Sequence, residues 1–93
     1  MPFRVILSPA AERQLGKVRG ASRVALIGMI FALGDQPRPP GALKIAGLRD
    51  VWRLRVRIDG RPWRVNYRLD ERGGEIVVAR IAARDEATYR RLR

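Results

Sequence analysis

Arginines and apolar residues alternate in the second half of the sequence, a pattern that places the arginines on one face of a β-strand. In Trp52–Ile58 the odd positions hold Arg53, Arg55 and Arg57, and the even positions are all apolar. Successive side chains of a strand point to opposite faces, so one face can enter a core while the other presents guanidinium groups. A guanidinium group stays charged at any working pH and grips phosphate through paired hydrogen bonds. The pattern therefore predicts a surface that binds a phosphate chain.

A second segment, Arg61–Leu69, repeats this alternation. Arg64, Asn66 and Arg68 take one parity, and the apolar residues Trp63, Val65, Tyr67 and Leu69 take the other. The dipeptide Asp59-Gly60 between the two segments is a strong signal for a tight hairpin turn. The sequence thus predicts an antiparallel hairpin with one cationic face. The alternative for these arginines is an ordinary solvated strand face.

The apolar parity of the same two segments carries large aromatic residues. Trp52, Trp63 and Tyr67 all lie opposite the arginines. We expect these three rings in the core, because their parity is opposite to that of the arginines. The alternative for Trp63 is stacking on a nucleobase.

The composition is strongly basic, with 20 Lys and Arg against 9 Asp and Glu and a formal net charge of +11. A field of this sign favours nucleic acid, an anionic membrane or an acidic protein as partner. The chain has no cysteine and no histidine, so it lacks thiolates and the commonest general base and metal ligand. Its carboxylates show no ligand spacing, so we expect no metal site and no cofactor.

Targeting signals are not evident in the sequence. No apolar run approaches the ~18 residues that a membrane span needs, and the first residues lack the apolar centre of a signal peptide. We therefore expect a cytoplasmic protein that does not associate with a membrane.

Two helices are predicted near the start of the chain. Ser8 is a good N-cap and Pro9 suits the first helical position. This helix is expected to end at Gly20. Ser22 is expected to cap a second helix, which Gly34 closes, so that the two form an antiparallel hairpin.

The rest of the chain is predicted to be mostly strand, within a single domain over residues 1–93. Residues 35–41 are rich in proline and form a rigid connector. A short C-terminal helix or tail follows over residues 84–93. The predicted strands are Phe3–Leu7, the edge strand Leu43–Leu48, the two arginine strands Val51–Ile58 and Arg61–Leu69, and the apolar, central strand Glu75–Ala83.

The predicted fold class is α+β. A helical hairpin with one apolar stripe must bury that stripe against one face of the sheet. We expect a four- to five-stranded, mainly antiparallel, twisted sheet, with the arginine face left open.

The chain resembles the RelE/ParE toxins of bacterial type II toxin–antitoxin systems over nearly its whole length. The resemblance rests on the order and spacing of several segments. They are the opening "FRVILSPAAERQL", the helical hairpin, the connector "QPRPPGALKIAGL", the strands "VWRLRV" and "WRVNY", and the closing "ARDEATY".

The resemblance implies a set of site residues. Arg53 and Arg55 take the basic positions of the third strand, and Arg64 takes the arginine of the aromatic-Arg-Val motif. Arg84 matches the arginine after the last strand, and Tyr89 the C-terminal aromatic. Tyr89 could instead pack the tail onto the sheet. Beyond these five candidate catalytic residues, the candidate RNA-binding residues are Lys44, Arg57 and Arg68.

RelE-like relatives are ribosome-dependent endoribonucleases that cut mRNA, so the resemblance implies that activity. Arg53, Arg55 and Arg64 would then hold the scissile phosphate, and Arg84 would lie near the leaving oxygen. Arginine is almost never deprotonated, so it moves protons badly. Relatives often have lysine on the third strand and histidine before the late arginine, where this chain has arginine and Ala83. A group of ribosomal RNA or the substrate itself is then the expected base.

Two other functions stay open at the level of the sequence. ParE-like relatives share the fold and poison DNA gyrase without cutting nucleic acid. A degenerate member would bind only its antitoxin or RNA. For every active case the resemblance implies a small antitoxin that wraps the toxin. An acidic segment would suit this cationic face. We expect a monomeric free toxin and a hetero-oligomer, a heterotetramer or larger, with the antitoxin.

Overall fold

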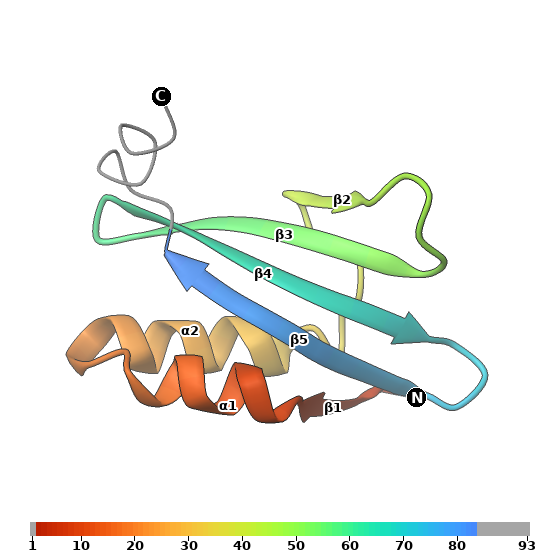
Figure 1. Ribbon diagram of the computed structural model, residues 1–93, viewed down its shortest axis with the longest axis horizontal. Coiled ribbons are helices and arrows are strands. Elements are labelled where there is room, and N and C mark those ends of the chain that lie inside the picture. Colours follow the sequence, from red (N-terminus) through yellow and green to blue (C-terminus); the bar gives the residue numbers. More distant parts are fainter. Residues whose placement is uncertain (1, 84–93) are drawn as a thin grey trace.

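The computed structural model describes residues 2–83, which form two helices and one five-stranded sheet (Figure 1). The predicted C-terminal helix or tail lies outside the described residues. In chain order the elements are β1 (Arg4–Leu7), α1 (Pro9–Gly16), α2 (Gly20–Ala32), β2 (Ala42–Lys44), β3 (Val51–Ile58), β4 (Arg61–Asp70) and β5 (Glu75–Ala83). In residues 2–83 no helix combines the length and apolar character needed to cross a membrane.

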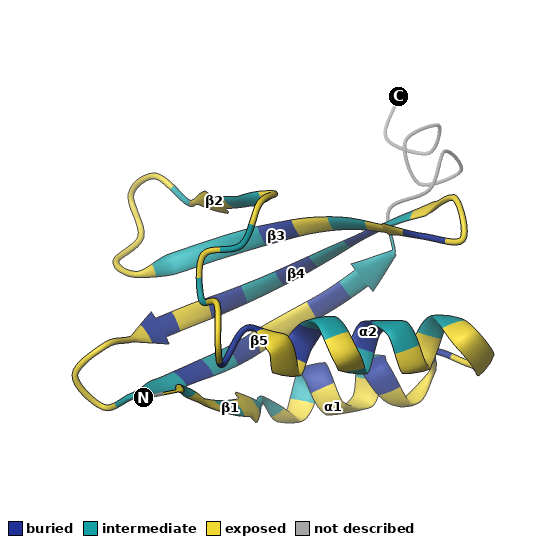
Figure 2. Cartoon of the chain, turned by 180° about the vertical axis from the view of Figure 1, so that it is seen from behind, coloured by how far each residue is buried: buried dark blue, intermediate teal, exposed yellow. Residues whose placement is uncertain are grey.

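The sheet is mixed, with the strand order β1-β5-β4-β3-β2. β1 runs parallel to β5, and every other neighbouring pair is antiparallel. Both helices lie on the same side of this sheet (Figures 1 and 2). The predicted α+β class, N-terminal strand and helical hairpin on one face are therefore confirmed.

The predicted strands differ from the observed ones mainly at the edges of the sheet. β3 and β5 have the predicted bounds, and the turn between β3 and β4 has positive φ at Asp59 (52°) and Gly60 (75°), as a tight hairpin requires. β2 is an edge strand, as expected, but it covers only Ala42–Lys44. β5 is interior, yet β4 occupies the middle of the sheet.

The start of α1 follows the prediction. Ser8 is the N-cap, its hydroxyl accepts a hydrogen bond from the Ala11 amide at 3.1 Å, and Pro9 opens the helix. The same hydroxyl donates to the Ala79 carbonyl of β5 at 3.0 Å. This one side chain therefore begins the helix and ties it to the sheet.

The junction between the helices was predicted wrongly. α1 ends at Gly16, four residues before Gly20, because the amides of Lys17 and Val18 close a tight turn on the carbonyls of Gln14 and Leu15. Gly20 starts α2 instead, with a φ of 65° that suits glycine. Ser22 therefore lies inside the first turn of α2 and is not its cap. The N-cap is Arg19, which makes no side-chain capping bond.

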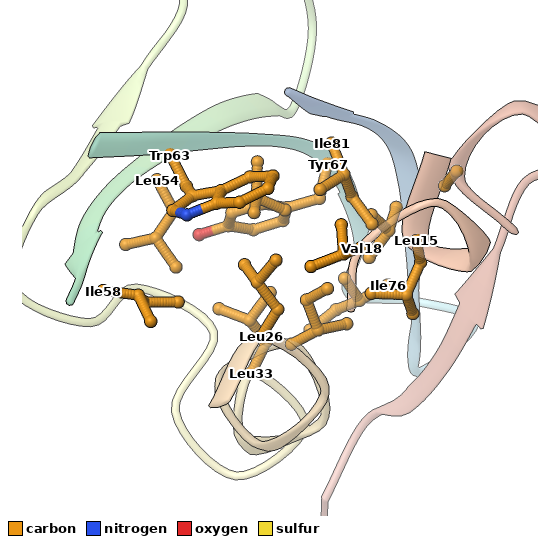
Figure 3. Packing of buried hydrophobic residues seen from close by; sticks show 14 of the residues in the cluster. Leu15, Val18, Leu26, Leu33, Leu54, Ile58, Trp63, Tyr67, Ile76 and Ile81 are labelled. Carbon is orange, nitrogen blue, oxygen red and sulfur yellow. The ribbon is translucent and has the colours of Figure 1, made fainter. Parts of the chain in front are cut away.

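The core lies between the helical hairpin and the sheet (Figure 3). Trp63 and Tyr67 are buried as predicted, with 7% and 0% of their surface exposed, and Trp52 packs against the core at its margin. Both helices, the strands β3, β4 and β5, and the turns that follow the two helices supply the buried side chains. The buried residues are Ala11, Leu15, Val18, Leu26, Ile30, Leu33, Leu54, Ile58, Trp63, Val65, Tyr67, Leu69, Ile76, Val78 and Ile81.

The proline-rich connector, residues 35–41, packs against the helix side of the sheet through contacts with Tyr67 and Trp52. The Tyr67 hydroxyl donates to the Pro37 carbonyl at 2.5 Å. The Arg38 guanidinium lies over the Trp52 ring, 5.4 Å from its centroid, and pairs with Glu71. The helix side of the sheet is therefore covered by α1, α2 and the connector. This leaves the other face to carry the polar residues.

Candidate nucleic-acid interface

Except for Arg61, which lies over the Trp63 ring on the helix side, the arginines of β3 and β4 share the sheet face opposite the helices. In the antiparallel register Arg55 lies directly opposite Arg64, and Arg53 lies directly opposite Asn66. Directly opposed side chains point to the same face, with their Cβ atoms about 4.5–5.5 Å apart. The structure therefore brings together three of the predicted site residues, Arg53, Arg55 and Arg64.

Like charges this close lower one another's basicity. The pKa of Arg53 lies below its usual value, first because of burial and then because of the positive charges of Arg55 and Arg64. Its Nε atom is buried and has no hydrogen-bond partner within the described part of the chain, and the same holds for Oδ1 of Asn66 directly opposite. A bound anion would offset this repulsion.

One residue of this surface was missed in the sequence. Arg80 of β5 pairs with Asn66 and so shares the face of Arg53. A β-bulge makes this possible: the register passes from Asn66↔Arg80 to Tyr67↔Val78, so β5 has one extra residue, Ala79. The apolar parity gives a signal that could have revealed the bulge. The buried apolar residues of β5 are Ile76, Val78 and then Ile81, which follows Val78 by three positions. A regular strand would point Val78 and Ile81 to opposite faces, so burying both on one face requires an extra residue between them.

The bulge is held by side chains that precede or belong to α1. β1 ends at Leu7, opposite Val78, so β5 loses its parallel partner there. The Ser8 hydroxyl then donates to the Ala79 carbonyl, and Oε1 of Gln14 accepts from the Ile81 amide at 2.6 Å. These two bonds satisfy backbone groups that a longer β1 would otherwise pair.

The predicted RNA-binding residues are more scattered. Arg68 shares the cationic face, opposite Val51 and Val77. Arg57 is on the same parity of β3, but its Nη1 donates to the Gly60 carbonyl of the hairpin turn at 3.0 Å. Lys44 pairs with Trp52, so its register places it on the helix side, away from the arginine row. Arg84 and Tyr89 lie outside the described residues.

The described part of this face suits charge stabilisation and not proton transfer. Around Arg53, Arg55 and Arg64 its ionisable groups are guanidinium groups, which bind phosphate and neutralise developing negative charge. The carboxylates of Asp70 and Glu75 share the face only at the far ends of β4 and β5. Among residues 2–83, no three His, Cys, Asp or Glu side chains gather closely enough to hold a metal ion.

Solved structures with the same architecture include RelE toxins from bacteria and an archaeon. No protein-family model and no curated protein matches the sequence. The RelBE2 toxin–antitoxin complex of Mycobacterium tuberculosis matches with a TM-score of 0.75 and 22% identity, over 90% of this chain and 100% of that chain.

Two further structures agree with this match. A free E. coli RelE mutant, in which two arginines are changed to alanine, matches with a TM-score of 0.73 and 18% identity, over 96% of this chain and 90% of that chain. The RelE–RelB complex of Pyrococcus horikoshii matches with a TM-score of 0.72 and 21% identity, over 92% of this chain and 99% of that chain. The chain has the RelE toxin fold.

Proposed function

We propose that the chain is the toxin of a type II toxin–antitoxin system and acts as a ribosome-dependent, metal-independent endonuclease of mRNA. The observation that carries this proposal is the register of β3 on β4, which sets Arg55 opposite Arg64 and Arg53 beside them on the face that the helices leave open. A cytoplasmic location, where ribosomes are found, follows from the same proposal.

The proposed reaction is an internal transesterification of RNA. The 2′ oxygen of a ribose attacks the adjacent phosphorus, the bond from phosphorus to the 5′ oxygen breaks, and a 2′,3′-cyclic phosphate and a 5′ hydroxyl result. One proton leaves the 2′ hydroxyl and one joins the 5′ oxygen. The arginines bind the phosphate and stabilise the added negative charge at phosphorus. The proton of the 2′ hydroxyl goes to a group of ribosomal RNA or to the substrate, because guanidinium groups do not serve as bases.

The proposal includes an acidic antitoxin. The M. tuberculosis and P. horikoshii structures are complexes of toxin with antitoxin. In this chain a formal charge of +11 and an arginine face free of helices would attract an acidic polypeptide. We therefore expect a hetero-oligomer with an antitoxin that masks the arginine face.

The test is a map of mRNA 5′ ends after brief induction in a bacterial host. Wild type should produce new ends at defined codon positions and stop translation. Arg55→Ala, on the open face, and Arg84→Ala, implied by the family resemblance, should both abolish these ends. Arg23→Ala removes the same charge from an exposed position on α2 and should behave as wild type.

The outcomes separate the candidate functions. Full cleavage by a folded Arg55→Ala protein would refute the role given to the arginine face. A DNA-damage response and filamentation without new mRNA ends would replace the nuclease with a gyrase inhibitor. No growth defect in wild type would indicate a degenerate member that only binds its partners.

A further inference from the structure

Two parallel rows of side chains cross the open face of the sheet. We call Arg55, Arg64 and Ala82 the Arg55 row, since the pairings Arg55↔Arg64 and Arg64↔Ala82 join them. We call Arg53, Asn66 and Arg80 the Arg53 row, joined in the same way. The Arg53 row spans three strands and carries a cation at each end with an amide between.

The Arg53 row has the chemistry of an anion site. Arg80 is exposed, and within residues 2–83 it makes no ion pair or side-chain hydrogen bond. Its guanidinium carries five N–H donors. Arg53 has a buried Nε without a partner in that part of the chain, and its pKa is lowered. A phosphate above Asn66 would accept hydrogen bonds from both guanidinium groups and from the Asn66 amide.

The spacing of the rows fits a nucleic-acid strand. Consecutive rows are two residues apart along β3 and β4, which corresponds to about 6.7 Å. This separation is comparable to that of neighbouring phosphates in an extended single strand. RNA that runs along β4 would therefore place one phosphate on the Arg55 row and the next on the Arg53 row.

We propose that Arg80, together with Arg53 and Asn66, forms a second phosphate subsite, which holds the RNA phosphate next to the one bound by Arg55 and Arg64. The proposal rests on RNA as the substrate, as argued above. The subsite depends on the bulge at Ala79. The extra residue places Arg80 on the same face as Asn66 and keeps Ile81 in the core.

The test measures RNA binding without cleavage. A single-stranded 2′-O-methyl RNA, which has no attacking hydroxyl, is titrated with the isolated protein by fluorescence anisotropy over a range of salt concentrations. Arg80→Ala should weaken binding about tenfold, as expected for one charge-assisted contact. The slope of log K against log salt should also fall by about 0.7, the value for one phosphate of a single strand.

Two further variants sharpen the result. Arg23→Ala, the charge-matched control on α2, should leave the slope unchanged. Asn66→Asp puts a negative charge between the two arginines and should weaken binding at least as much as Arg80→Ala. A slope and affinity for Arg80→Ala equal to those of Arg23→Ala would overturn the subsite.

The subsite and the proposed function fail in different ways. If mRNA is cut in cells but Arg80→Ala binds RNA like the control, the subsite is wrong and the nuclease stands. If Arg80→Ala shows the expected loss but no mRNA ends appear with wild type, the subsite stands as an RNA-binding site and the nuclease falls.

Discussion

At the scale of single residues, Tyr67 links the hairpin of the arginine strands to the proline-rich connector. Its ring is fully buried, and its hydroxyl donates to the Pro37 carbonyl at 2.5 Å. Burial raises the pKa of the phenol to about 12, and the nearby charge of Arg38 opposes that rise. The side chain therefore packs the core and also satisfies a backbone carbonyl of the connector.

Tyr67→Phe should lower the free energy of unfolding by about 1–3 kcal/mol, because it leaves the Pro37 carbonyl without its donor and keeps the ring. Urea unfolding at neutral pH measures the change. The control is Val24→Ala on α2, where the side chain is 71% exposed, so this variant should not lower the midpoint. An unchanged midpoint for Tyr67→Phe would mean that water replaces the lost bond.

The same hydroxyl makes stability depend on alkaline pH. A phenol with a pKa of 10.0 when unfolded and about 12 when folded binds its proton more tightly in the native state. Its contribution is complete below pH 10 and is lost as the pH rises toward 12. The difference in unfolding free energy between wild type and Tyr67→Phe should therefore shrink over that interval. A constant difference across the same interval would contradict the raised pKa.

The sequence predicts site residues well where the alternation of a strand is regular. Arg53, Arg55 and Arg64 follow strict parity, so their shared face could be read from the sequence. Arg80 could not be assigned with the same rule, because one inserted residue reverses the parity after Val78. Lys44, a predicted RNA-binding residue, lies on the helix side for another reason. The loop between β2 and β3 sets the register of these two strands, and the sequence does not determine that register.

At the scale of elements, the end of the helical hairpin meets the start of β1 at Gly34. The Phe3 amide donates to the Gly34 carbonyl at 2.7 Å, and a Cβ on Gly34 would lie 2.7 Å from the Phe3 carbonyl oxygen. Contact this close requires glycine. Gly28, inside α2, is different, since a Cβ there would meet no atom within 4 Å.

These two glycines give a paired prediction. Gly34→Ala should destabilise the fold by roughly 1–3 kcal/mol, since backbone has to move to admit the methyl group. Gly28→Ala should stabilise it by about 0.5–1 kcal/mol, because alanine is the better residue in an exposed helix interior. Thermal unfolding of both variants measures the opposite shifts. Equal shifts would show that α2 does not meet β1 as described.

The two helix boundaries show how far local signals reach. Ser8 and Pro9 start α1 as predicted, because capping depends on a few neighbouring residues. The end of α1 has two local signals, because Gly16 and Gly20 can each end a helix. Leu15 and Val18 are both buried in the core, on either side of the end that the structure has. The choice between two such glycines depends on tertiary contacts that the local pattern does not contain.

At the scale of the whole molecule, the fold divides the sheet into an apolar side and a cationic side. The helices and the connector cover the apolar side (Figure 2). Arg53, Arg55, Arg64 and Arg68 lie on the other side. This division was predictable, because a single apolar stripe on the helices can cover only one face. Its consequence is a concentration of like charge on one surface of a protein with a net charge of +11.

That concentration of charge should make stability depend on anions in two distinguishable ways. Sodium chloride screens self-repulsion, since the Debye length falls from about 30 Å at 0.01 M to about 8 Å at 0.15 M, so the unfolding midpoint should rise. Inorganic phosphate at equal ionic strength should raise it further, because an anion that binds only the native state adds RT ln(1 + [L]/Kd).

Arg55→Gln separates the two effects. It removes one of the two guanidinium groups of the Arg55 row, and it removes a positive charge that repels Arg53. The variant should keep most of the response to chloride and lose most of the additional response to phosphate. Arg23→Gln, which changes the same charge on α2, should keep both. If phosphate stabilised Arg55→Gln as much as Arg23→Gln, the phosphate would bind elsewhere, and the arginine face would be a diffuse field with no defined anion site.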